Sequence, residues 1–308
     1  MSKTIRAGFI GSILSVLSLS LTCVCAQSPS APSPQASAGP VTKGQRIYAA
    51  HHSYFLPIPP ILNEIAKTAG YGDQVFVGTR YIGGSKSLFH WNIKDEDNKA
   101  KQALQAGAVD LLVLTPVYLP DDGIEKFVRF GLKANPDLRV TVQEFWLPYD
   151  QYEPHFYDPP LLPVPKTVDH NARTGAELRE IHKRYFQEMD ALIGDLNHQL
   201  GKPAIAVVPV GQAVIALREK IIAGQAPGLH AQEDLFADPL GHPAPALQVL
   251  IAYAHYAVIY RKNPAGLPVP QALAALKLPD GQAAALNTLL QQLAWDAVIH
   301  HPLSGVKP

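Results

Sequence analysis

The chain has 308 residues, of which 47% are hydrophobic and 17% are charged, a composition typical of a globular protein and too apolar for a disordered one. Lys and Arg total 26 and Asp and Glu total 26, so the charge balance does not favour nucleic-acid binding. The two cysteines, Cys23 and Cys25, lie close to the N-terminus. This excludes a cysteine nucleophile, a disulfide and a cysteine-based zinc site from the chain after residue 26.

The first 26 residues have the pattern of a secretory signal peptide. Lys3 and Arg6 form a positive start, residues 7–22 are apolar and uncharged, and small residues at 24–26 precede a cleavage site at Gln27. The alternative is a membrane anchor, but the apolar run is near the lower limit of about 17 residues for a bilayer span. We expect a periplasmic or secreted protein that is not stably inserted in a membrane after cleavage.

Residues 27–43 are rich in Pro, Ser and Ala without periodicity, which is typical of a linker. Strands and helices are expected to alternate from residue 44 on. Residues 44–265 are therefore assigned to one α/β domain, and residues 266–308 to a C-terminal helical extension packed on that domain.

Two kinds of apolar pattern distinguish the strands from the helices. Residues 110–114 (DLLVL) are continuously apolar, as in strands buried on both faces, whereas residues 59–69 have helical apolar spacing. The same reasoning predicts strands at 46–50, 73–81, 110–114, 138–145 and 204–210, and helices at 59–69, 96–106, 124–134, 174–200, 211–223, 245–260 and 282–299. Such alternation predicts a doubly wound parallel five-stranded sheet with helices on both faces.

Polar residues gather where these strands end. Ligands of such sheets bind beyond the carboxyl ends of the strands. The residues at those ends, together with a late loop (LFADPLGHPAP) before a helix, are Ser53, Gly83, Gly84, Ser85, Thr115, Glu144, Trp146, Tyr149, Asp238 and His242.

Three of these residues have the chemistry of a catalytic triad. The Ser53 hydroxyl is a weak nucleophile unless a base takes its proton; His242 could be that base, and Asp238 could orient its imidazole. The backbone N–H groups of Ser53 and Gly84 could then hold the oxyanion.

Each feature also has a purely structural interpretation. A serine after a strand is usually a turn residue, and Asp238-Pro-Leu-Gly-His242 is by itself a proline-glycine turn. His51 and His52 point to opposite faces of a strand and have no third ligand at a recognisable spacing, so no metal is expected. Gly83-Gly84 lacks the G-x-G-x-x-G pattern, so no dinucleotide cofactor is expected. His300-His301 is interpreted as surface.

The joint order of these segments resembles the four-block layout of the SGNH hydrolases, the GDSL-like esterase/lipase superfamily. His51-His-Ser-Tyr-Phe resembles the nucleophile block, Tyr81-Ile-Gly-Gly-Ser85 the glycine block, residues 110–116 the third block, and residues 238–260 the terminal Asp/His block. The resemblance implies an SGNH/flavodoxin-like three-layer sandwich. It also implies ester hydrolysis through an acyl-enzyme on Ser53, without a cofactor.

The sequence departs from the family pattern at three places. His51-His52 replaces Gly-Asp or Gly-x before the serine, and three residues rather than two separate Asp238 from His242. Thr115 stands where the family supplies an asparagine to the oxyanion hole, and it offers one hydroxyl donor instead of an amide.

A run of aromatic residues and prolines follows the fourth predicted strand, from Phe145 and Trp146 through Tyr149 to Tyr157. It is either an exposed surface that stacks on sugar rings, with Glu144, Trp146 and Tyr149 as substrate-binding residues, or a lid packed over the core. The preferred interpretation is an exported esterase acting on acyl, most simply acetyl, esters of a carbohydrate or small molecule. The alternatives are a catalytically impaired carbohydrate-binding protein on the same scaffold, and an interaction module that uses helix 282–299.

Overall fold

The structure is a computed structural model that describes Met1, residues 39–152 and residues 167–307. The expected signal peptide and most of the expected linker lie outside these residues. All the elements below belong to the compact unit of residues 34–308. Within the described residues, no helix combines the length and apolarity that a membrane span requires.

The centre of this unit is a five-stranded parallel sheet with strand order β2-β1-β3-β4-β5. The strands are β1 (Arg46–His51), β2 (Val75–Tyr81), β3 (Leu111–Leu114), β4 (Arg139–Glu144) and β5 (Ile205–Pro209). From β1 the chain passes first to β2 on one side and then to β3 on the other. The carboxyl ends of β1 and β3 therefore flank the point where the winding reverses, which is where such sheets bind ligands.

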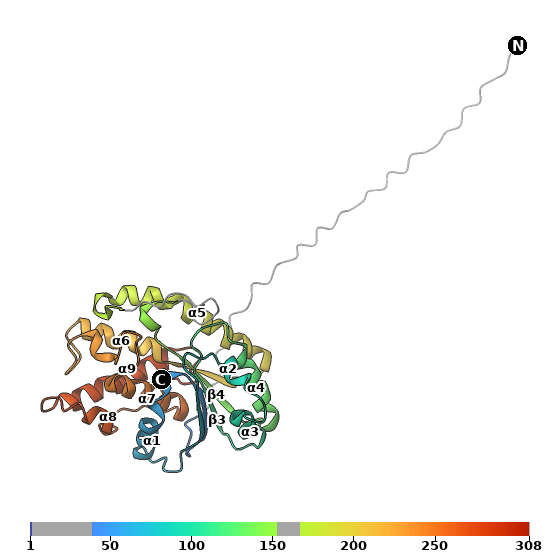
Figure 1. Cartoon of the computed structure of the whole chain (residues 1–308), viewed down its shortest axis with the longest axis horizontal. Helices are drawn as coiled ribbons and strands as arrows, with labels where there is room; N and C mark the ends of the chain where they lie inside the picture. Colours follow the sequence, from blue (N-terminus) through green and yellow to red (C-terminus); the bar gives the residue numbers. More distant parts are fainter. Residues whose placement is uncertain (2–38, 153–166, 308) are drawn as a thin grey trace. The chain divides into compact units, whose positions relative to one another are not determined.

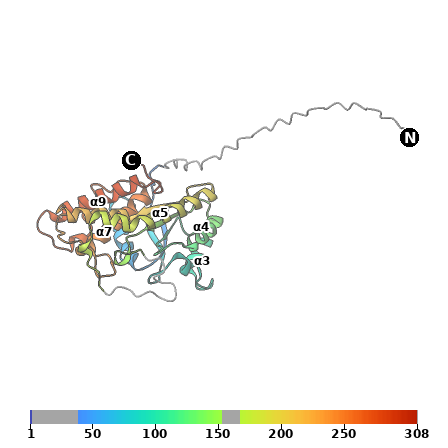
Figure 2. The same ribbon diagram turned by 90° about the horizontal axis from the view of Figure 1, so that it is seen from above.

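Helices cover both faces of the sheet, as the doubly wound prediction requires (Figure 1). One layer contains α1 (Ile58–Thr68), α6 (Val210–Ile222), α7 (Pro245–Tyr260) and α9 (Gln282–His300). The other contains α2 (Ser87–Trp91), α3 (Lys99–Gln105), α4 (Asp122–Ala134) and α5 (Gly175–Leu200). Figure 2 shows the long α5 and the α7–α9 layer after a quarter turn. The short helices are η1 (Ser53–Phe55), η2 (Pro148–Asp150), η3 (His170–Ala172), η4 (Gln232–Leu235) and α8 (Gln271–Ala274).

Local signals in the sequence set several helix ends. At the start of α5, Thr174 and Glu177 form a reciprocal capping box, and at its end Gly201 adopts a left-handed conformation with φ 65°. Prolines lie in the first turn of α1 and of α7, where a missing N–H costs nothing. The five-residue α2 was not predicted, because it is too short to show periodicity.

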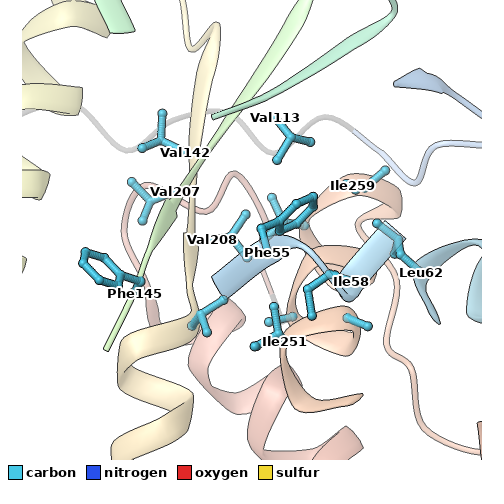
Figure 3. Packing of buried hydrophobic residues seen from close by; sticks show 14 of the residues in the cluster. Phe55, Ile58, Leu62, Val113, Val142, Phe145, Val207, Val208, Ile251 and Ile259 are labelled. Atoms are coloured by element: carbon cyan, nitrogen blue, oxygen red, sulfur yellow. The ribbon is translucent and has the colours of Figure 1, made fainter. Parts of the chain in front are cut away.

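The buried core includes residues of the sheet and of both helix layers, and Figure 3 shows part of it on the side of α1 and α7. Phe55, Ile58 and Leu62 meet Val113 of β3 and Val208 of β5 there. Nearly every residue of α7 is buried, because this helix packs against α1, α6, α9 and the sheet. That explains why its sequence is apolar on all sides.

The apolar face of α9 is covered within the same unit. Leu286, Leu290 and Val298 are buried, and α9 packs against α6 and α7. The interpretation of this helix as a partner-binding surface was therefore wrong. His301, expected at the surface, is also buried, with Asp190 and Glu144 as its neighbours at 3.2 and 3.6 Å.

Candidate functional site

Ser53 lies immediately beyond the carboxyl end of β1 and begins the short helix η1. The preceding residue shapes this turn. The His52 backbone N–H donates to Thr115 Oγ1 at the end of β3 (3.1 Å), and the His52 ring Nδ1 accepts from the Tyr54 N–H (3.3 Å). Ser53 is therefore fixed at the switch point of the sheet and is half-buried.

Ser53 and Gly84 line one open hollow. Gly84 has φ 56°, in the left-handed region that favours glycine. The complete lining is His52, Ser53, Tyr54, Gly84, Val117, Phe145, Pro148 and Leu240. The hollow thus joins residues that follow β1, β2, β3 and β4 to the loop that carries Asp238 and His242.

Buried polar side chains hold the segment after Gly84. Ser85 is fully buried, its hydroxyl lies 2.8 Å from His90 Nε2, and its carbonyl accepts from the Val117 N–H. The buried carboxylate of Asp121 accepts from the N–H groups of Ser87 and Leu88 at the start of α2. The glycine turn is therefore attached to β3 and to the beginnings of two helices.

Asp238 and His242 form a hydrogen-bonded pair, with 2.6 Å between Asp238 Oδ2 and His242 Nδ1. The other oxygen of Asp238 accepts from the backbone N–H groups of Gly241 and His242 (3.1 and 3.2 Å). Burial alone would raise the pKa of Asp238, but the hydrogen bonds from His242 and Gly241 outweigh it, so the pKa is lowered. The three-residue spacing is accommodated by a turn in which Gly241 has φ 100°.

Three aromatic residues form hydrogen bonds that hold the Asp238–His242 loop beside the hollow. The Tyr54 hydroxyl donates to the carbonyl of Leu240 (2.6 Å), and the Tyr149 backbone N–H donates to the same oxygen (3.2 Å). Trp146 Nε1 donates to the carbonyl of Gly241 (2.9 Å), and its ring stacks on Tyr54 with centroids 4.6 Å apart. The His242 ring lies edge-on to Tyr54, with centroids 5.3 Å apart.

A buried ion pair stabilises the backbone next to Tyr149. Tyr149 and Asp150 both have left-handed backbones, with φ 53° and φ 50°. Arg218 of α6 donates to both oxygens of the Asp150 carboxylate (2.5 and 2.8 Å), and His170 Nδ1 lies 3.0 Å from the same carboxylate. Such backbone conformations are costly for residues other than glycine and persist where their surroundings fix them. The Asp150–Arg218 contact supplies that restraint.

The other histidines around the hollow are poor bases. Burial lowers the pKa of His52 to about 3 and that of His90 to about 4, and it also lowers the pKa of His51. None of the three has a carboxylate partner among the described residues, whereas His242 has Asp238. No group of metal-binding side chains occurs in the part of the chain that the structure describes.

Thr115 lies behind the hollow. Its side chain is buried, and its oxygen accepts the His52 N–H, so its own hydrogen and a second lone pair remain for further contacts. Its expected role as an oxyanion donor stays a prediction. In the structure, Thr115 makes a contact that positions the backbone after β1 relative to β3.

The interpretation of residues 145–149 as an exposed aromatic surface was wrong for its first residues. Phe145 and Trp146 are buried, so Trp146 contacts the Asp238–His242 loop rather than solvent. Glu144 is also fully buried and bonds to Gln212 beneath α6 (3.2 Å), because side chains alternate along β4 and this one points away from the hollow. Tyr149 is half-buried beside the loop. The rest of the aromatic run, residues 153–157, lies outside the described residues.

Sequence reasoning missed Tyr54 and the Asp150–Arg218 pair. Tyr54 is adjacent to Ser53, but its partner Leu240 is 186 residues away. Asp150 and Arg218 are 68 residues apart, and no local pattern links them.

No family model matches this chain, and no curated protein matches it. Two solved structures are similar to it. One is a DUF4886 family protein from Bacteroides uniformis, with 13% identity and a TM-score of 0.49, over 84% of this chain and 96% of that chain. The other is the acetyl xylan esterase AlAXEase, with 13% identity and a TM-score of 0.38, over 69% of this chain and 99% of that chain.

Proposed function

We propose that the protein is an exported serine esterase that hydrolyses small acyl esters, with acetyl esters of a carbohydrate as the expected substrates. Ser53 is the nucleophile, His242 the general base, and Asp238 the residue that orients it. The observation that carries the proposal is the Asp238–His242 hydrogen bond on a loop whose Leu240 lines the same hollow as Ser53 and Gly84.

The hydrogen bond geometry suits base catalysis by His242. Because His242 Nδ1 bonds to the Asp238 carboxylate, Nε2 carries the lone pair that can accept a proton. Ser53 Oγ attacks the ester carbonyl while its proton passes to His242 Nε2. The protonated imidazole then gives this proton to the departing alcohol. Water, deprotonated by the same imidazole, releases the acid and restores the serine.

The oxyanion of the tetrahedral intermediate is assigned to the backbone N–H groups of Ser53 and Gly84. Backbone donors that are already fixed in place cost no reorganisation during the reaction. The left-handed turn at Gly84 and its attachment to β3 through Ser85 support this assignment. Thr115 is proposed as a further donor through its hydroxyl.

The lining of the hollow supports a small acyl group. Its apolar side chains are those of Val117, Phe145, Pro148 and Leu240. Burying each additional methylene favours binding only where the lining can receive it, so long chains are expected to react poorly. We infer a preference for acetate over longer acids.

Hydrolysis of p-nitrophenyl acetate and of acetylated xylan tests the proposal. Ser53→Ala is expected to lower kcat by at least about 10³-fold, and a phosphonate ester should add its mass to the wild type but not to this variant. His242→Ala should lower kcat to a similar extent. His300→Ala is its matched control, because His300 is exposed at the end of α9, and its activity should be unchanged.

Equal rates for the wild type and Ser53→Ala would remove Ser53 from the mechanism. Absence of hydrolysis together with binding of xylan would favour the alternative, a carbohydrate-binding protein on this scaffold. Export is tested separately, because cell fractionation and the mass of the mature chain should show cleavage before Gln27.

A further inference from the structure

The amino end of the sheet contains a second cavity, opposite the hollow that holds Ser53. Its volume is about 60 Å³, and it lies among the first residues of β4 and β5, the end of α7 and the C-terminal turn. β4 has 6 residues, so at about 3.3 Å per residue the two sites are about 20 Å apart. The cavity is lined by Arg139, Val140, Thr141, Pro203, Ala204, Ile205, Ala206, Arg261, Ser304 and Gly305.

Two arginines line this cavity, and no acidic residue does. The Arg139 guanidinium donates to the Val258 carbonyl (3.3 Å) and lies 3.5 Å from Gln45 Oε1, and Arg261 donates to the Gly39 carbonyl (3.2 Å). Neither arginine forms an ion pair within residues 39–152 and 167–307. By contrast, arginines on α4, α5 and α6 form ion pairs with carboxylates.

The two guanidinium groups also repel each other. Burial, and then the charge of Arg261, lowers the pKa of Arg139 to about 10, and burial lowers the pKa of Arg261. The Tyr260 hydroxyl acts in the opposite direction and raises the pKa of Arg139. Two positive charges are thus held in a partly buried space without a compensating negative side chain, which is unfavourable unless something else supplies the negative charge.

The C-terminus of α7 provides part of the compensation. Arg139 bonds to the carbonyl of Val258, and Arg261 is the left-handed C-cap of this helix. A helix C-terminus carries about half a negative charge, whereas the arginines carry two positive ones. More than one unit of positive charge therefore remains.

One residue that lines the same cavity has a buried hydroxyl group without a hydrogen-bond partner among the described residues. Thr141 is 1% exposed, lines the cavity, and its Oγ1 has no hydrogen-bond partner among the described residues. Thr141 lies two residues after Arg139 on β4, so both side chains leave the same face of the sheet. Buried hydroxyls are normally satisfied, and a polar ligand in the cavity would satisfy this one.

We propose that this cavity binds a small oxyanion, either a carboxylate or a phosphate group, between Arg139 and Arg261 with a hydrogen bond from Thr141. A guanidinium group matches the two oxygens of either group through paired N–H donors. This inference concerns a different site from the esterase, and it stands or falls independently of Ser53.

Thermal unfolding of the full chain in the presence of anions tests the site. Inorganic phosphate forms one arm and malonate the other, each compared with chloride at equal ionic strength. Wild type should show a saturable rise of the unfolding temperature with at least one of the two anions, as expected for a ligand that binds only the folded state. The arm with the lower half-saturation concentration identifies the group.

Three variants locate the effect. Arg261→Gln should abolish the anion-specific rise, and Thr141→Val, which keeps both charges, should raise the half-saturation concentration about tenfold or more, because it removes one hydrogen bond to a charged ligand. Arg46→Gln is the matched control, since Arg46 begins β1 at the same end of the sheet but pairs with Asp110. It should respond as wild type does.

Two results would overturn the proposal. The first is a wild type that responds to phosphate and malonate only as it does to chloride. The second is an Arg261→Gln variant that retains the full anion-specific response, which would leave the arginines as partners of the α7 C-terminus alone.

Discussion

The ion pair between Asp150 and Arg218 provides a quantitative test of how the site is supported. Both side chains are 1% exposed, and the arginine contacts both carboxylate oxygens. Asp150→Asn keeps the shape of the side chain and removes its charge, so it leaves Arg218 buried without a compensating anion. Breaking a buried pair in this way costs about 3–5 kcal/mol of unfolding free energy.

The pH dependence measures the contacts of the Asp150 carboxyl with both His170 and Arg218. Burial alone would raise the pKa of Asp150, but hydrogen bonds from His170 and Arg218 lower it from 3.8 to about 2. Since one pKa unit corresponds to about 1.4 kcal/mol, the lowered pKa contributes about 2 kcal/mol of stability. A lowered carboxyl pKa stabilises the fold above pH 4, and this contribution is lost as the pH falls towards 2.

Urea unfolding at pH 7 and at several values between pH 5 and 2 measures both effects. The matched control is Glu219→Gln. Glu219 follows Arg218 on α6 and accepts from Nε and Nη2 of Arg179 (2.7 and 2.6 Å), but at the surface. Exposed pairs contribute about 0–1 kcal/mol. The reasoning fails if both variants lose the same free energy, or if Asp150→Asn loses as much stability between pH 4 and 2 as the wild type does.

Three further predictions concern the loop and the cluster beneath it. Asp238→Asn should lower kcat on p-nitrophenyl acetate by about 10⁴-fold, because it disturbs the His242 tautomer. The urea stability should change little, because the position is part-exposed. A loss of kcat of less than tenfold would contradict the proposed role. Trp146→Phe keeps the stacking on Tyr54 but loses the bond to Gly241, so it should cost about 1 kcal/mol and lower kcat more than KM changes; unchanged kcat would show that this bond does not position the loop. The Asp190 and Glu144 carboxylates outweigh burial and raise the pKa of His301 to about 9, so stability from this contact is complete below pH 6.5 and is lost as the pH rises through 9. His301→Gln should remove this alkaline loss in urea titrations, and a variant that keeps it would refute the assignment.

Much of the fold could be predicted because its signals are local. The apolar run at residues 110–114 became β3, and the predicted helix 245–260 has the same limits as α7. The alternation of strands and helices then restricted the topology to a doubly wound sheet, which the order β2-β1-β3-β4-β5 confirms. The short α2 was not predictable, because five residues are too few to show a helical period. The burial of His301 was not predictable either, because no local pattern in the sequence links this histidine to its partners.

For the candidate site, the sequence by itself determined which chemical groups stand at the strand ends, because a parallel sheet places all its carboxyl ends at one edge. It therefore pointed to Ser53 and Gly84, and the loop before the helix at 245–260 pointed to Asp238 and His242, before any contact was known. Only the tertiary structure decided that Trp146 and Tyr54 hold the Asp238–His242 loop, and that Glu144 turns away beneath α6. Those contacts join segments that lie from 68 to 186 residues apart, and packing across such separations leaves no periodic trace in the chain.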